Sequence, residues 1–112
     1  MAEALAKAEL ATWGICYHAQ QSLEKGLKAL LVATGADPPR SHNLVRLNAA
    51  VDPPVFGPDD EDDLIAITGW AVLHRYPADL PEPTPSRANE ALAVATRGLR
   101  MIAERLKTGD AS

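Results

Sequence analysis

The stretch CYHAQQSLEKGLKALLVAT, residues 16–34, decides the fold of this 112-residue chain. Its apolar side chains recur at steps of three and four residues, which gathers them into a narrow arc of an α-helix. The pattern predicts a helix from about Ala2 to Thr34, ended by the left-handed cap that Gly35 favours. The predicted buried stripe is widened by Leu31 and consists of Cys16, Ala19, Leu23, Leu27, Leu30 and Thr34.

The nine prolines fall into three clusters that mark loops. The segments between and after these clusters predict three further helices. The second helix is expected from about Ser41 to Val51, with Ser41 as its N-cap. The third is expected from about Asp60 to Arg75, and the acids at its start suit the positive end of a helix dipole. The fourth is expected from about Pro85 to Lys107, with Thr84 as its cap.

The fourth segment has the clearest apolar seam, and its alternating steps of four and three suit near-antiparallel packing. That seam is Ala88, Leu92, Ala95, Leu99, Ile102 and Leu106. No alternating strand pattern competes with the helices. The sequence therefore predicts an all-α fold: an antiparallel, up-and-down bundle of four helices, up to five, in a single domain over residues 1–112.

Charge and composition narrow the classes of function. The formal net charge is −4, from 15 acidic and 11 basic side chains, so phosphate binding by the whole surface is disfavoured and any anion site must be a local patch. Acids gather between Asp52 and Asp63 and cations on the fourth helix, a separation that can steer a partner or a second copy of the chain. One cysteine and no long apolar run predict a cytoplasmic protein without a membrane segment.

Signatures of metal and nucleophilic chemistry are missing from the sequence. The three histidines, His18, His42 and His74, lack the spacing of a zinc site, so neither a metal nor another cofactor is expected. Cys16 lies on the apolar stripe, where a thiol ionises poorly. There is no Gly-x-Ser-x-Gly turn and no glycine-rich phosphate loop. We therefore predict no catalytic residue.

Five basic or imidazole side chains form the predicted phosphate-binding set: Lys25, Lys28, Arg40, His42 and Arg75. The two lysines lie on the polar arc opposite the leucine stripe. Arg40 and His42 precede the second helix, where free backbone N–H groups can hold a phosphate. Arg75 ends the third helix. The competing interpretation is an ordinary solvated surface, with Glu24 and Lys28 as an i,i+4 ion pair and a simple capped start to the second helix.

The run YHAQQSLEKGLKALL, residues 17–31, resembles the first-helix signature of HEPN domains. PRSHNL, residues 39–44, is similar to the start of that family's second helix, and RYP, residues 75–77, to the end of its third. The resemblance implies a bundle of four or five helices, usually a homodimer, that binds nucleotide or RNA. It also implies a minimal nucleotidyltransferase as partner, in some cases within a toxin–antitoxin pair.

The sequence departs from the ribonucleases of that family, which carry an arginine followed four to six residues later by a histidine. Here Arg40 and His42 are separated by one residue, His74 precedes Arg75, and no histidine follows position 74. This favours the non-catalytic branch. Two alternatives stay open. The first is a metal-independent ribonuclease with an atypical pair, either Arg40 with His42 or Arg75 with His74 from a dimer mate. The second is a helical protein–protein interaction module.

Overall fold

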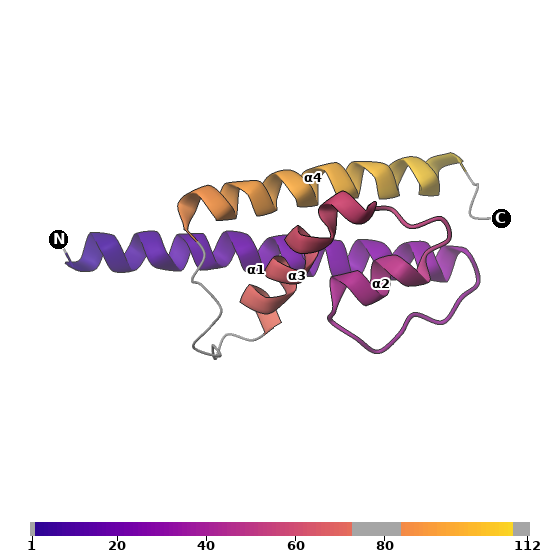
Figure 1. Ribbon diagram of the computed structural model, residues 1–112, viewed down its shortest axis with the longest axis horizontal. Coiled ribbons are helices and arrows are strands. Elements are labelled where there is room, and N and C mark those ends of the chain that lie inside the picture. The colour runs from indigo at the N-terminus through magenta and orange to yellow at the C-terminus, as the bar shows by residue number, and fades with distance from the viewer. Residues whose placement is uncertain (1, 73–83, 109–112) are drawn as a thin grey trace.

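The computed structural model describes residues 2–72 and 84–108. It contains the four helices α1 (Ala2–Ala33), α2 (Leu44–Ala50), α3 (Glu61–Val72) and α4 (Pro85–Thr108), with one 3-10 turn, η1 (Pro58–Asp60), before α3. The described residues form no strand. The all-α, four-helix prediction is confirmed (Figure 1). The predicted end of the third helix, up to Arg75, lies outside the described residues.

The leucine stripe of α1 forms the centre of the core. Cys16, Leu23 and Leu27 are completely buried, and Ala19, Leu30 and Leu31 nearly so. Only Thr34, just beyond the end of the helix, is exposed. The helix continues without a break through Gly14 and extends past the start of α4 (Figure 1). The stripe gives every other helix a surface to pack against.

The directions of the helices correct one part of the prediction. Near the start of α4, Ala88 shares an apolar cluster with Cys16, and further along Ile102 faces Gly26. Position along α4 therefore rises with position along α1, whereas an up-and-down order requires it to fall. The two long helices are parallel neighbours, as Figure 1 shows, and not the antiparallel pair that was expected.

The segment between α1 and α2 explains this difference. Residues 34–43 include Pro38 and Pro39 and form no helix, because proline cannot continue one. The segment runs back along α1 until His42 lies against Gln20 and Glu24. In an up-and-down bundle the second helix runs antiparallel to the first. Here the loop takes that antiparallel path, and α2 then runs in the same direction as α1 (Figure 1).

Among the described helices, α3 runs opposite to the other three. Its start lies beside the middle of α4, where Asp60 of η1 pairs with Arg97, and Trp70 near its end lies beneath Arg87 at the start of α4. α3 is therefore antiparallel to α4. Leu64 and Ile67 of α3 are buried as predicted, whereas Ile65 is 52% exposed.

The buried seam of α4 is rotated from the predicted one. Leu92 and Leu106 are 49% and 41% exposed, and Leu99 is only partly buried. The buried positions are Ala88, Ala91, Val94, Ala95, Gly98 and Ile102. Most of these side chains are small, so the backbone of α4 comes close to α1, and close approach rather than side-chain size selects the contact face.

The cap of α2 also differs from the prediction. The Asn43 side-chain oxygen accepts hydrogen bonds from the backbone N–H groups of Val45 (3.0 Å) and Arg46 (3.3 Å), so Asn43 is the N-cap. Ser41 instead accepts from the N–H of Asn43 at 3.0 Å and turns the chain into that cap. Two other predicted caps are confirmed: Thr84 accepts from the N–H of Arg87 at 3.1 Å, and Gly35 has φ 83°.

Two arginines of α4 hold the loop between α2 and η1 in place. Arg97 makes two hydrogen bonds to the Asp60 carboxylate, at 2.7 and 3.0 Å, and stacks over the Phe56 ring. The pair lowers the pKa of Asp60 through hydrogen bonding to Arg97. Arg105 donates to the carbonyl oxygens of Pro53 and Pro54. The loop is therefore fixed against α4 by directional contacts.

Gly98 is the tightest point of this arrangement, and substituting it tests the packing. A Cβ there would lie 2.2 Å from the Phe56 ring, so Gly98→Ala is expected to destabilise the protein by about 1–3 kcal/mol despite a better helix propensity. At Gly14 nothing lies within 4 Å, and Gly14→Ala should stabilise by up to about 1 kcal/mol. Urea unfolding measures both. Equal stability of the two variants would contradict the close contact.

Candidate phosphate-binding site

The Glu24 carboxylate organises the candidate site. It lies on α1 and is only 8% exposed. One of its oxygens, Oε1, accepts from Gln20 Nε2 and from His42 Nδ1, both at 2.8 Å. The other, Oε2, accepts from Lys28 Nζ at 3.0 Å. Gln20 Nε2 also donates to the backbone carbonyl of His42 at 3.0 Å, so α1 holds both the backbone and the ring of His42.

The sequence creates this network by placing polar residues at the edge of the leucine stripe. Gln20, Glu24 and Lys28 are spaced by four, so they form one row along α1. The row lies between the core stripe and the exposed arc, and burial falls along it from Gln20, fully buried, to Lys28, partly exposed. The network therefore reaches from the core to the surface.

Burial by itself would raise the pKa of Glu24. The hydrogen bonds from Gln20, His42 and Lys28 outweigh that effect, so the pKa of Glu24 lies below its ordinary value. The carboxylate is ionised at neutral pH and can only accept hydrogen bonds. His42 Nδ1 must therefore carry a proton and donate it, which leaves Nε2 as the free ring nitrogen on a side chain that is 64% exposed.

The structure brings together two of the predicted site residues, Lys28 and His42, on the same carboxylate. Lys25 follows Glu24 in α1, and Arg40 precedes His42 by two residues. Both are exposed, and neither makes an ion pair with another residue in the described part of the chain. The fifth predicted residue, Arg75, lies outside the described residues.

The expectation that backbone N–H groups at the start of α2 are free for a phosphate is wrong. Those of Val45 and Arg46 are taken by Asn43, and that of Leu44 donates to Thr68 Oγ1 of α3 at 3.1 Å. Any anion bound here must be held by side chains, because the helix start has no free donor among these three groups.

Sequence reasoning missed the roles of Gln20 and Glu24. It assigned Glu24 to a surface pair with Lys28 and gave Gln20 no role. The pair exists, at 3.0 Å, but it belongs to a network that also fixes His42. The signal available in the sequence was position: a Gln and a Glu at i,i+4, bordering a leucine stripe, will be partly buried and will need partners.

Metal-binding clusters and membrane-spanning helices are both absent from residues 2–72 and 84–108. No group of three His, Cys, Asp or Glu side chains there is arranged to hold a metal ion. In the same residues, no helix combines the length and the apolar character needed to cross a lipid bilayer.

Comparison with known families finds a match for this chain. The profile of the HEPN domain matches residues 1–106, nearly the whole chain. The chain belongs to the HEPN family. A search of curated proteins found no match, and a search of solved structures found none either. Family membership of this HEPN domain supports a nucleotide- or RNA-related module in general terms.

Removing the Glu24 charge tests the network. Because its pKa is lowered on folding, ionised Glu24 adds stability above the unfolded pKa, near 4.5, and that stability is lost as pH falls through the lower folded pKa. Glu24→Gln is expected to cost about 1–3 kcal/mol at neutral pH and to weaken the loss of stability on acidification. Urea unfolding between neutral pH and the acid range measures both.

The matched control is Glu104→Gln on α4, which removes an exposed carboxylate without an ion pair among the described residues. Its effect should stay within about 0.5 kcal/mol. If the two variants behaved alike at every pH, the hydrogen bonds to Glu24 would have no energetic weight.

Proposed function

We propose that this HEPN domain is a non-catalytic module that binds the phosphate of a nucleotide or of RNA. The proposed site consists of Lys25, Lys28, Arg40, His42 and Arg75. In this proposal the domain, residues 1–112, acts in the cytoplasm as a homodimer and supports a minimal nucleotidyltransferase, within a toxin–antitoxin pair. No metal or other cofactor takes part.

The observation that carries the proposal is the division of roles around Glu24. Its carboxylate positions Lys28 and His42, whereas Lys25 and Arg40 have no ion-pair partner among residues 2–72 and 84–108. Lys28 contacts the Glu24 carboxylate, Lys25 follows Glu24 in the sequence, and Arg40 lies two residues before His42, in a chain whose overall charge is negative. A local excess of cations is what an anion site requires on such a surface.

The donors suit a phosphate group. An arginine can donate two parallel hydrogen bonds to phosphate oxygens, and a lysine ammonium has three N–H groups, of which Lys28 uses one on Glu24. His42 donates through Nε2 only when the ring is protonated, because Nδ1 is already engaged.

Ligand titration tests the site. ATP, GTP and short single-stranded RNA are titrated against the wild type and the double variant Lys25→Ala/Arg40→Ala by calorimetry. Each charge-assisted hydrogen bond contributes roughly 1.5–3 kcal/mol, so the double variant should bind at least about tenfold more weakly. RNA binding should also weaken with added salt.

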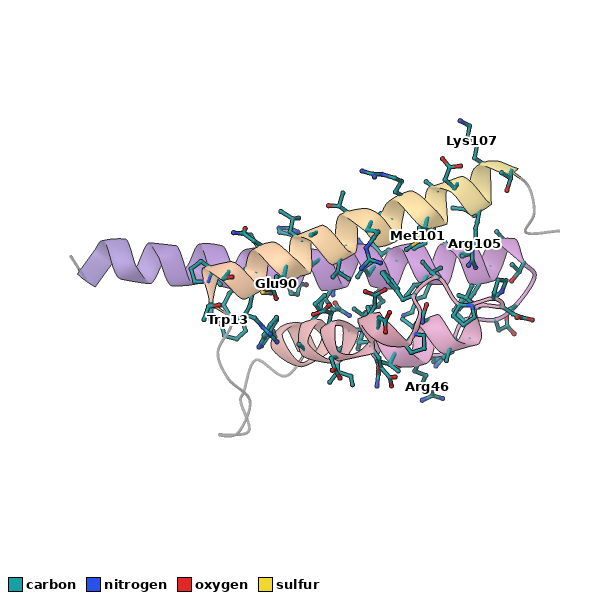
Figure 2. The ribbon with its side chains drawn as sticks, turned by 45° about the horizontal axis from the view of Figure 1, so that its top comes forward. Trp13, Arg46, Glu90, Met101, Arg105 and Lys107 are labelled. Carbon is teal, nitrogen blue, oxygen red and sulfur yellow. The ribbon has the colours of Figure 1, made fainter. Side chains whose placement is uncertain are left out.

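The control variant, Arg100→Ala/Lys107→Ala, removes the same charge from exposed positions of α4. Figure 2 shows Lys107 projecting from the side of α4 turned away from α2 and α3. This variant should keep wild-type affinity. Equal affinity of the two double variants, or no binding by the wild type, would remove the site assignment.

One observation favours a second candidate, a metal-independent ribonuclease. Glu24 fixes the His42 ring at 2.8 Å and leaves Nε2 exposed, an arrangement that suits a general acid or base. The non-catalytic proposal expects single-stranded RNA to stay intact with purified protein and EDTA. Cleavage that disappears in both His42→Ala and Glu24→Gln would establish the ribonuclease instead.

The third candidate is a module that works through protein contacts alone. It is distinguished by its outcome in the titration: no binding of ATP, GTP or RNA by the wild type, together with one stoichiometric protein partner in a pull-down. Ligand binding that depends on Lys25 and Arg40 would exclude it as the sole role.

A further inference from the structure

A pocket of about 270 Å³ lies on the surface between α2, the loop after it and α3. Its walls are mainly apolar: Val45, Ala49, Pro54, Phe56, Pro58 and Leu64. Phe56 and Leu64 are buried and form the inner part, while Ala49 and the two prolines are exposed. Neither the Glu24 network nor the predicted phosphate site shares a residue with this pocket.

The amide in the wall of the pocket is already satisfied. Asn48 Nδ2 donates to the Phe56 carbonyl at 2.9 Å, and Asn48 Oδ1 accepts from the Phe56 N–H at 2.8 Å. These two bonds fix the Phe56 backbone and turn the polar atoms of Asn48 toward the protein. What remains for an occupant is apolar surface, which suits a side chain without polar atoms.

The rim of the pocket is acidic. Glu61 is part of the wall, Asp62 follows it in the sequence, and Asp59 lies two residues before it. All three are exposed, and within the described residues none makes an ion pair. Asp60, by contrast, is committed to Arg97. Arg46 projects from the outer side of α2 (Figure 2), and two arginines of α4 contact wall residues: Arg97 stacks over Phe56 and Arg105 donates to the Pro54 carbonyl.

The size and charge of the pocket exclude some occupants. It is smaller than the roughly 300–1,000 Å³ of typical small-molecule sites, so it fits one side chain better than a cofactor. The Glu61 carboxylate in its wall repels phosphate, so a nucleotide fits this pocket poorly. An apolar anchor with positive neighbours is complementary to both the pocket and its rim.

We propose that this pocket is a docking site for a partner protein, which inserts one large apolar side chain flanked by lysine or arginine. A second copy of this chain fits less well. Among the large exposed apolar side chains that the structure describes, Leu106 has two cationic neighbours in the sequence, Arg105 and Lys107. One of these, Arg105, is already held by the carbonyls of Pro53 and Pro54.

The experiment selects peptides from a random display library on the immobilised wild-type chain. Enriched peptides are then titrated by fluorescence anisotropy against Ala49→Trp, in which an indole fills the mouth of the pocket. We expect peptides with one Leu, Met or Phe next to two or more Lys or Arg. Their affinity should fall at least about tenfold for Ala49→Trp.

Matched variants separate the pocket from its surroundings. Ala50→Trp adds the same side chain to an exposed position of α2 outside the pocket and should bind like the wild type. Glu61→Gln/Asp62→Asn should weaken binding about fivefold, and Glu90→Gln/Glu104→Gln on α4 should not. Thermal unfolding of each variant confirms that the fold is kept. Lys25→Ala/Arg40→Ala should bind the peptides normally, which makes this test independent of the phosphate site.

Three results would overturn the proposal. The first is no enrichment over selection on Ala49→Trp. The second is enrichment of acidic or uncharged peptides. The third is self-association of the wild type that Ala49→Trp abolishes in sedimentation, because that would place a second copy of the chain in the pocket.

Discussion

A carboxylate buried in the side of a helix must find hydrogen-bond donors, because an unpartnered buried charge costs several kcal/mol. Glu24 finds two of its donors, Gln20 and Lys28, on its own helix and the third, His42, beyond the loop that follows. Meeting this need requires residues 34–43 to return along α1. The path of that loop then sets where α2 begins and in which direction it runs.

The elements that depend on local pattern were predictable from the sequence. The leucine stripe of α1, the proline-marked loops and the Thr84 cap each follow from residues close together in the chain. The relative direction of α1 and α4 was not predictable. It depends on contacts such as that of Glu24 with His42, which are 18 residues apart and leave no periodic pattern in the sequence. From the sequence alone, a histidine before a helix, such as His42, fits a phosphate-binding residue and a solvated surface residue equally well.

The face of α4 illustrates a second limit. Ranking residues by hydrophobicity puts Leu92 and Leu106 in the core, yet Ala91 and Gly98 are buried in their stead. Small residues win at this contact because they allow two helix backbones to come close, a gain that a hydrophobicity scale does not include. For the candidate site, the cations were identified from the sequence, but the carboxylate that positions two of its members was not.

The two surfaces discussed above have opposite signs and separate anchors. In the sequence, Lys25 and Lys28 lie close to Glu24, and Asp59, Asp60 and Asp62 lie close to Glu61. Arg97 and Asp60 pair with each other between α4 and η1, so these two charges of opposite sign compensate each other. The proposed phosphate site and the proposed docking pocket therefore differ in the sign of the charged side chains assigned to them.

The parallel course of α1 and α4 also has an electrostatic consequence. In an antiparallel pair, the partial charges at neighbouring helix ends have opposite signs and offset each other. Here the carbonyl ends of both long helices lie at the same end of the molecule, so their partial negative charges reinforce each other (Figure 1). α1 has no basic residue in its last turn, whereas α4 has Arg105 and Lys107. The end of α4 therefore carries cations that oppose its dipole, whereas the end of α1 carries none in its last turn.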